Sequence, residues 1–258
     1  MKNIILYDTH AHLDNPAYDT DRDEVMEKIK ASGVGFVNNI GADIKTSYQS
    51  ISLAEKYDFV YATCGVHPSE TLDMTEDDIK TLYEMSKHEK VKAIGEIGLD
   101  YHYENNPDPE TQKYWFKRQL ELSKEVGLPV VIHDRESKGE TIKILKDFKI
   151  DRGVMHCYSG SAETAKELLK MGFYISFTGV VTFKNARKSI EALKSVPLDR
   201  LFIETDCPYM SPEPFRGTRN DSSNVIKVAE KYAEVKGISL EEVIFTTTNN
   251  AKEFFKVK

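Results

Sequence analysis

The chain has 258 residues, of which 40% are hydrophobic and 30% charged, and its formal net charge is −7. These proportions describe a globular protein with a sizeable core, either one large domain or two small ones. The negative charge argues against a protein that holds long nucleic acid by bulk electrostatics, because such proteins are basic. A nucleic-acid enzyme of this charge is expected to engage an end or a short piece, through metal ions and a few local cations.

The sequence carries no pattern typical of a membrane or secreted protein. No apolar run approaches the roughly 20 residues that span a bilayer, and Met1-Lys2-Asn3 leads into only four apolar residues, unlike a signal peptide. Cys64, Cys157 and Cys207 are an odd number, far apart, and form no Cys-x-x-Cys pair. We therefore expect a cytoplasmic protein without disulfides, whose cysteines are core or strand-end residues.

Short apolar runs alternate with helical patterns along the chain. The first predicted strand is Ile4-Ile5-Leu6-Tyr7, which leads into the polar stretch Asp8–Asp14. Further strands are predicted at residues 34–40, 59–64, 91–97, 128–133, 153–156, 173–177 and 201–205. Helices are predicted at residues 19–32, 45–56, 75–87, 110–126, 139–148, 162–171, 185–195, 222–236 and 240–255. Thr75 and Asp78 form a predicted capping box at the start of one of them.

This alternation predicts the fold class. Strands that alternate with helices indicate βαβ units and a parallel sheet. Eight such units in a chain of this length predict an α/β protein, a single (β/α)₈ TIM-type barrel that spans residues 1–258, with an extra C-terminal helix. The alternative is an open doubly wound sheet. The first strand is not followed by Gly-x-Gly-x-x-Gly, which weakens a dinucleotide-binding interpretation.

Residues of metal-ligand type stand at the predicted carboxyl ends of the strands, where barrels of this kind place their active sites. His10 and His12 are two residues apart and point to the same side of extended backbone. Alone they would also suit a pair of surface or core histidines. The ends of four later strands add further candidates, which are Glu96, His133, His156 and Asp206. This set includes four of the seven histidines in the chain.

Six His, Glu and Asp ligands without cysteine suit a catalytic site for Zn²⁺, Mg²⁺ or Mn²⁺, and the sequence does not choose among these ions. They suffice for two ions bridged by Glu96, with His10, His12 and Asp206 on one and His133 and His156 on the other. A water held by the metal would be acidified and could attack at neutral pH. Asp206 is the candidate general base.

The chain resembles the TatD family of metal-dependent hydrolases, within the amidohydrolase superfamily. The resemblance rests on residues 8–14 (DTHAHLD), 65–68 (GVHP), 95–101 (GEIGLDY), 132–136 (IHDRE), 156–160 (HCYSG), 204–209 (ETDCPY) and Arg216-Gly217-x-Arg219-Asn220. It implies a TIM-like barrel and one or two metal ions on the six ligands. It also implies hydrolysis of phosphodiester bonds in DNA, often from a 3′ end. One departure is Asp221-Ser222 after Asn220, where such sequences often read Glu-Pro.

Four motif residues are candidates for substrate binding. His67 either contacts a substrate phosphate or fixes its loop. Arg135 follows His133 by two residues and either holds a phosphate oxygen or pairs with a neighbouring carboxylate. Arg216 lies, with Arg219, on the loop after the eighth strand, where such barrels often bind phosphate. Tyr101 either stacks on a base or packs on a neighbouring helix.

Three functions compete. The favoured one is a metal-dependent deoxyribonuclease, a 3′-5′ exonuclease, monomeric and acting on DNA ends or short single strands. The second is a metallo-amidase or lactonase on the same barrel. Its relatives often use a carboxylated lysine as the bridge, whereas Glu96 stands at this strand end and Lys92 lies at the strand's start. The third is a non-enzymatic metal-binding protein, and the intact ligand set with a candidate base argues against it.

Overall fold

The computed structural model of the protein describes residues 5–258, and these divide into two compact units. One unit comprises the chain up to Asn39, Cys157–Leu169 and Tyr174–Lys258. The other comprises Ile40–His156 and Lys170–Phe173. The strands are parallel and follow the order β1-β2-β3-β4-β5-β6-β7-β8. Together with the alternating helices, this sequential order confirms the predicted (β/α)₈ fold class.

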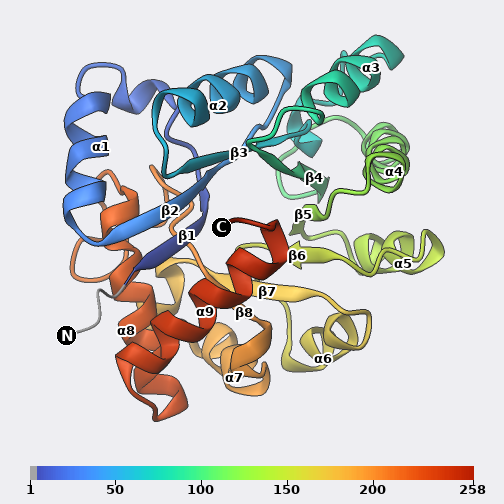
Figure 1. Cartoon of the computed structure of the whole chain (residues 1–258). Coiled ribbons are helices and arrows are strands. Elements are labelled where there is room, and N and C mark those ends of the chain that lie inside the picture. The colour runs from blue at the N-terminus through green and yellow to red at the C-terminus, as the bar shows by residue number, and fades with distance from the viewer. Residues whose placement is uncertain (1–4) are drawn as a thin grey trace. The chain divides into compact units, whose positions relative to one another are not determined.

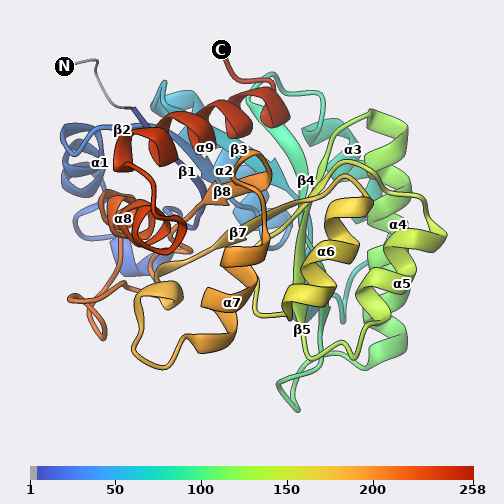
Figure 2. The ribbon, with the colours of Figure 1, turned by 90° about the horizontal axis from the view of Figure 1, so that it is seen from below.

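In the first unit the strands are β1 (Leu6–Ala11), β2 (Val34–Asn39), β7 (Tyr174–Phe177) and β8 (Leu201–Ile203). Its helices are α1 (Arg22–Ala31), α6 (Ala162–Lys170), α7 (Arg187–Ser195), α8 (Val225–Lys236) and α9 (Leu240–Phe255). Helix α9 is the predicted extra C-terminal helix, and it packs on β1 and β8 (Figures 1 and 2). Short 3₁₀ helices η1 (Pro16–Tyr18), η3 (Gly179–Thr182), η4 (Leu198–Arg200) and η5 (Ser222–Asn224) lie in the loops.

In the second unit the strands are β3 (Val60–Cys64), β4 (Val91–Asp100), β5 (Val130–Arg135) and β6 (Gly153–Met155). Its helices are α2 (Ile44–Lys56), α3 (Glu76–Met85), α4 (Pro109–Val126) and α5 (Glu140–Asp147), and a 3₁₀ helix, η2, spans Pro68–Glu70. Figure 1 shows these helices outside the strands of their unit. The predicted capping box of Thr75 and Asp78 is confirmed at the start of α3.

Several strand predictions were wrong at their ends; for example, the strand predicted at residues 128–133 is β5, Val130–Arg135. Strand β1 was expected to end at Tyr7 but continues to Ala11, because Asp8 and Ala11 pair with β2 and the polar side chains are buried. Ile4, at the predicted start, lies outside the described residues. Strand β4 was expected to end at residue 97 but continues to Asp100, which pairs with Arg135 of β5.

Gly98 makes this close pairing of β4 and β5 possible. Its φ is +151°, and a Cβ atom there would lie 1.9 Å from the carbonyl oxygen of His133. Only glycine combines that backbone conformation with so close an approach. The glycine therefore permits the strand extension that brings Asp100 beside β5.

Buried polar side chains tie loops and strands together within each unit. In the first unit the Tyr232 hydroxyl of α8 donates to the Phe202 carbonyl of β8 (2.8 Å) and accepts from the Phe177 amide of β7 (3.0 Å). In the second unit Gln119 of α4 makes two hydrogen bonds to the backbone of Val66, at 2.7 and 3.0 Å. Gln112, which lies in the same helix, makes two similar hydrogen bonds to the backbone of Asp100, at 2.9 and 2.8 Å. These bonds fix the carboxyl ends of strands that carry candidate site residues.

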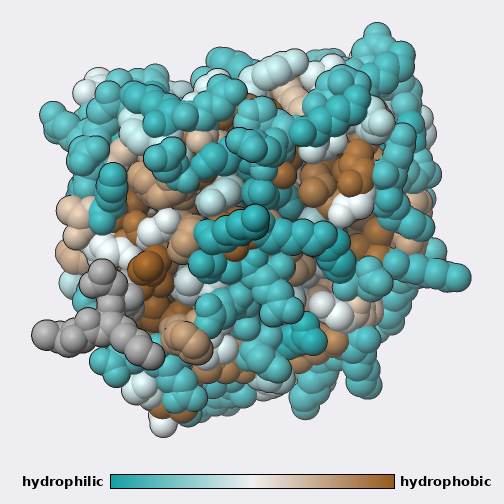
Figure 3. Space-filling view, in the orientation of Figure 1, coloured by the Kyte–Doolittle hydropathy of each residue, from teal (hydrophilic) through white to brown (hydrophobic). Residues whose placement is uncertain are grey.

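Hydrophilic residues cover most of the molecular face drawn in Figure 3. Within residues 5–258, no helix is both long and apolar enough to cross a bilayer. The described cysteines are free thiols, and Cys64 and Cys207 are buried, as expected. Burial raises the pKa of each of these two thiols to about 12, so both stay protonated and unreactive near neutral pH.

Candidate metal centre

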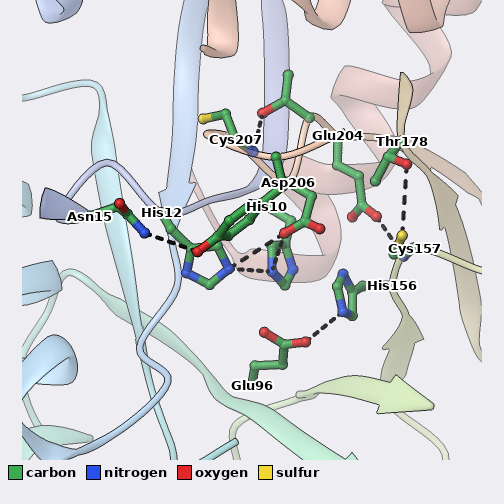
Figure 4. Close-up of polar contacts among 12 residues, drawn as sticks. His10, His12, Asn15, Glu96, His156, Cys157, Thr178, Glu204, Asp206 and Cys207 are labelled. Atoms are coloured by element: carbon green, nitrogen blue, oxygen red, sulfur yellow. Dashed lines mark hydrogen bonds and ion pairs between the residues drawn. The ribbon is translucent and has the colours of Figure 1, made fainter. Parts of the chain in front are cut away.

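The first ligand group consists of His10, His12 and Asp206, all in the first unit. His10 lies within β1 and is fully buried, and His12 follows the strand. Their Nε2 atoms are 3.3 Å apart, and they lie 3.7 and 3.5 Å from Oδ1 of Asp206. Figure 4 shows the three side chains directed towards one another. The structure therefore brings together the three residues that the sequence assigned to one ion.

The backbone holds Asp206 against the end of β1. The amide of Asp206 donates to the carbonyl of His10 (2.9 Å), and the amide of His12 donates to the carbonyl of Cys207 (2.8 Å). Asp206 adopts a left-handed backbone conformation, with φ +56°, which aspartate tolerates better than most residues. The loop after β8 thus continues the pairing beside β1 and carries the carboxylate to both histidines.

Asp8 lies beneath this group, fully buried in β1. Its carboxylate accepts from the Thr205 amide at 2.9 Å and from the Thr205 hydroxyl at 2.6 Å, and it also contacts the amide of His10 at 3.3 Å. Burial raises the pKa of Asp8 to about 7, against the opposing effect of hydrogen bonds from Ser222 and Thr205. Asp8 therefore fixes the backbone on both sides of the first ligand group.

The second ligand group consists of Glu96, His133 and His156, all in the second unit. Oε1 of Glu96 lies 2.9 Å from Nδ1 of His133 and 2.6 Å from Nε2 of His156 (the latter contact is drawn in Figure 4). The two histidine nitrogens are 3.4 Å apart. The structure therefore brings these three together as well, although Glu96 lies inside β4 rather than at its end.

Two further residues join the second group. Oδ2 of Asp100 lies 3.2 Å from Nε2 of His133, and Nε2 of His67 lies 3.9 Å from Oε1 of Glu96. One donor atom each from His67, Asp100 and His133 fall within 4.8 Å of one another. Asp100 was not among the predicted metal ligands, because the predicted strand ended at residue 97. Asp100 follows Glu96 by four residues, a spacing that puts two side chains on the same side of a strand. This spacing was the signal that could have revealed it.

His67 contacts Ser69 through Nδ1 of its ring. Nδ1 lies 3.2 Å from the amide nitrogen of Ser69 and 2.7 Å from its hydroxyl oxygen. Burial, and then repulsion from His133, lower the pKa of His67 to about 3. His67 therefore faces Glu96 and His133 as a neutral imidazole near pH 7. Burial opposes the charge of His133, but the hydrogen bonds that its ring donates to the carboxylates of Asp100 and Glu96 outweigh burial and raise the pKa of His133.

The donor sets of both groups suit a divalent metal ion. In the first group, two imidazole nitrogens and one carboxylate oxygen lie within 4.8 Å of one another. Nitrogen and oxygen donors without thiolate are the ligands of catalytic Zn²⁺ and of Mn²⁺. The convergence of two Nε2 atoms and a carboxylate on one point is the arrangement that such an ion requires.

The predicted substrate contacts have the following surroundings. Arg135 donates to the Tyr103 hydroxyl at 3.2 Å, and its guanidinium lies 4.9 Å over the Tyr103 ring. The Tyr101 hydroxyl donates to Glu140 of α5 at 2.6 Å, so the ring packs against that helix rather than standing open. Arg216 is exposed and lies 4.1 Å over the Phe183 ring. Arg219, in contrast, forms an ion pair with Asp21 and is less suited to hold phosphate.

Glu204 is a buried acid to which the sequence assigned no role. Its carboxylate accepts from the Cys157 amide at 2.6 Å and from the Ser176 hydroxyl at 2.6 Å. Cys157 directly follows His156 and has a left-handed backbone, with φ +43°. Glu204 thus fixes the residue next to a metal-ligand candidate. Its place two residues before Asp206 in the ETD motif was the available signal.

Comparisons with known proteins agree with this geometry. Residues 7–256 match the family described as TatD related DNase. An uncharacterized metal-dependent hydrolase of Bacillus subtilis, YabD, is 49% identical across 98% of this chain and 100% of that protein. The 3′-5′ ssDNA/RNA exonuclease TatD of Erwinia tasmaniensis is 31% identical across 98% of this chain and 100% of that protein.

Solved structures of TatD proteins have the same fold. The crystal structure of YJJV, a TatD homologue from Escherichia coli K12, matches with a TM-score of 0.92 and 29% sequence identity, over 98% of each chain. A TatD family hydrolase from Entamoeba histolytica matches with a TM-score of 0.89 and 25% identity, over 98% of each chain. The chain therefore belongs to the TatD-related DNase family of metal-dependent hydrolases.

Proposed function

We propose that the protein is a metal-dependent exonuclease that hydrolyses phosphodiester bonds at the 3′ end of single-stranded DNA. The observation that carries the proposal is the convergence of His10, His12 and Asp206, with a carboxylate beside two imidazoles. The Erwinia tasmaniensis relative, named for 3′-5′ exonuclease activity on ssDNA and RNA, supports the substrate class. The negative net charge favours an end over a long duplex.

We further propose that each ligand group binds divalent metal, with Glu96 as the carboxylate of the second group. Support comes from the fold class, because enzymes of the (β/α)₈ fold build their sites at the carboxyl ends of the strands. All ligands except Glu96, which lies inside β4, are at or just beyond such ends. One or two divalent ions, Zn²⁺, Mg²⁺ or Mn²⁺, would be held by His10, His12, Glu96, His133, His156 and Asp206. A bound ion would supply Lewis acidity and lower the pKa of water.

The chain's own residues would perform the remaining chemistry. Asp206, whose side chain is only partly buried, would accept the proton of the attacking water and return it to the leaving oxygen. His67, a neutral imidazole beside Glu96 and His133, would contact a phosphoryl oxygen of the substrate. Arg135 and Arg216 would contact the charged backbone, and Arg135 is already oriented by Tyr103.

A direct test uses purified protein and single-stranded DNA labelled at the 5′ end. We expect progressive shortening from the 3′ end, abolition by EDTA, and recovery with one of the three ions, with metal content followed by elemental analysis. Opening of a lactone or amide with the DNA left intact would instead support the amidohydrolase alternative. Size measurement in solution would test the expected monomer. The cytoplasmic location stays a prediction from the sequence.

A further inference from the structure

Tyr209 is an exposed aromatic residue beside the first ligand group. It lies three residues after Asp206, and 54% of its surface is exposed. The edge-to-face contact between its ring and that of His12 has a centroid distance of 6.5 Å. Its hydroxyl accepts a hydrogen bond from Nδ2 of Asn15 at 3.1 Å. One side of the ring is therefore turned to a metal-ligand candidate while much of it faces solvent.

The backbone of Tyr209 is held from both sides. Its amide donates to the Asp206 carbonyl at 3.0 Å, and its carbonyl accepts from Nδ2 of Asn220 at 2.8 Å. Asn220 is fully buried, and it also donates to the Thr205 carbonyl at 3.3 Å. A ring anchored at its backbone and at its hydroxyl loses little conformational entropy when a ligand binds.

Exposed apolar side chains gather on this loop. Met210 and Phe215 are 39% and 42% exposed, and together with Tyr209 they are three of the nine large hydrophobic residues that stand exposed among residues 5–258. Folding alone gives no reason to expose three such side chains within seven residues of each other. Exposed apolar side chains on the loop that follows Asp206, with Tyr209 against His12, indicate a binding site for a flat, partly apolar molecule.

We propose that Tyr209 stacks on the nucleobase of the terminal nucleotide and thereby favours single-stranded ends. This inference rests on the proposed function, since it takes the substrate to be a nucleic acid. An unpaired base offers its face to an aromatic side chain, whereas a base inside a duplex is already stacked on both sides. Stacking of this kind tolerates any base, because each has an aromatic face.

The experiment compares Tyr209→Ala with Tyr209→Phe and with Tyr48→Ala. Tyr48 is a matched control, because it is a tyrosine of α2 with 55% exposure. Binding is measured by fluorescence anisotropy with a labelled, phosphorothioate-linked oligothymidylate. We expect Tyr209→Ala to weaken binding about tenfold, as the loss of one stacked base predicts. Tyr209→Phe keeps the ring and should restore most of the affinity, and Tyr48→Ala should match the wild type.

Hydrolysis separates stacking from a merely structural role. For Tyr209→Ala we expect kcat/KM to fall about tenfold on ordinary single-stranded DNA but to stay unchanged when the terminal nucleotide is abasic. An equal loss on both substrates would mean that the ring only orients His12 and would overturn the proposal. Wild-type binding by Tyr209→Ala would overturn it too. If binding depends on Tyr209 while no DNA is cleaved, the stacking stands and the exonuclease function fails.

Discussion

The two ligand groups differ in what holds their side chains. His12 and Asp206 of the first group are 14% and 13% exposed and are positioned through backbone pairing and the buried Asp8. In the second group Glu96 and His156 are 5% and 4% exposed and contact each other directly at 2.6 Å. A buried carboxylate is costly unless it is paired, so the second group is preorganised by its own contacts. The first group depends on supporting residues. Each group keeps partly exposed members, which are His12 and Asp206 in the first and His133, 18% exposed, in the second.

The largest expected effect comes from Asp206→Asn, which alters the first group alone. The variant should retain most of the metal while kcat falls by about 100- to 10,000-fold, because a general base is lost. Elemental analysis and steady-state kinetics provide the measurement, with the exposed Asp199→Asn as the matched control. Full activity in Asp206→Asn would exclude it as the base.

A smaller effect is expected from Thr205→Val, which removes the hydroxyl that donates to Asp8 and keeps a β-branched side chain. Loss of a residue that supports a metal ligand typically weakens metal binding about 10- to 100-fold. Calorimetric titration with Zn²⁺ or Mn²⁺ would measure this loss. Unchanged affinity would show that the first group does not depend on the hydrogen bond between Thr205 and Asp8. The two groups would then not differ in their need for supporting residues.

Gln119→Leu tests the support of the second unit. The substitution leaves the buried amide and carbonyl of Val66, next to His67, without their hydrogen-bond partner. It should lower the free energy of unfolding by about 2 kcal/mol. Urea denaturation measures the change, and Gln49→Leu on the exposed face of α2 is the control. A shift equal to that of the control would show that water replaces the glutamine at no cost.

The smallest expected effect concerns the pairing of α3 with α4, away from both groups. A hydrogen bond from Arg118 lowers the pKa of Glu76 from 4.5 to about 2. Because the folded-state pKa is depressed, the contribution to stability is present above pH 4.5 and disappears as the pH falls towards 2. Glu76→Gln should slightly lower the urea midpoint at pH 7 and leave it unchanged near pH 2. Equal shifts at both pH values would contradict this origin.

Much of the fold and of the ligand set followed from local patterns. Alternating apolar runs predicted the strand order, and residue types at strand ends predicted both ligand groups. What was missed depends on contacts between distant residues. Asp100 was placed in a loop because its pairing with Arg135 and its bonds to Gln112 cannot be read from neighbouring residues. For the same reason the sequence could not predict that Arg219 forms an ion pair with Asp21, 198 residues away.

The left-handed backbone at Asp206 restricts which substitutions the position can accept. Chemistry alone would allow either acidic residue to bind a metal or accept a proton. At φ +56°, however, aspartate and asparagine are accommodated far more readily than glutamate. The backbone conformation therefore restricts substitution at this position independently of catalysis. Replacement of Asp206 by glutamate would strain the backbone in addition to moving the carboxylate.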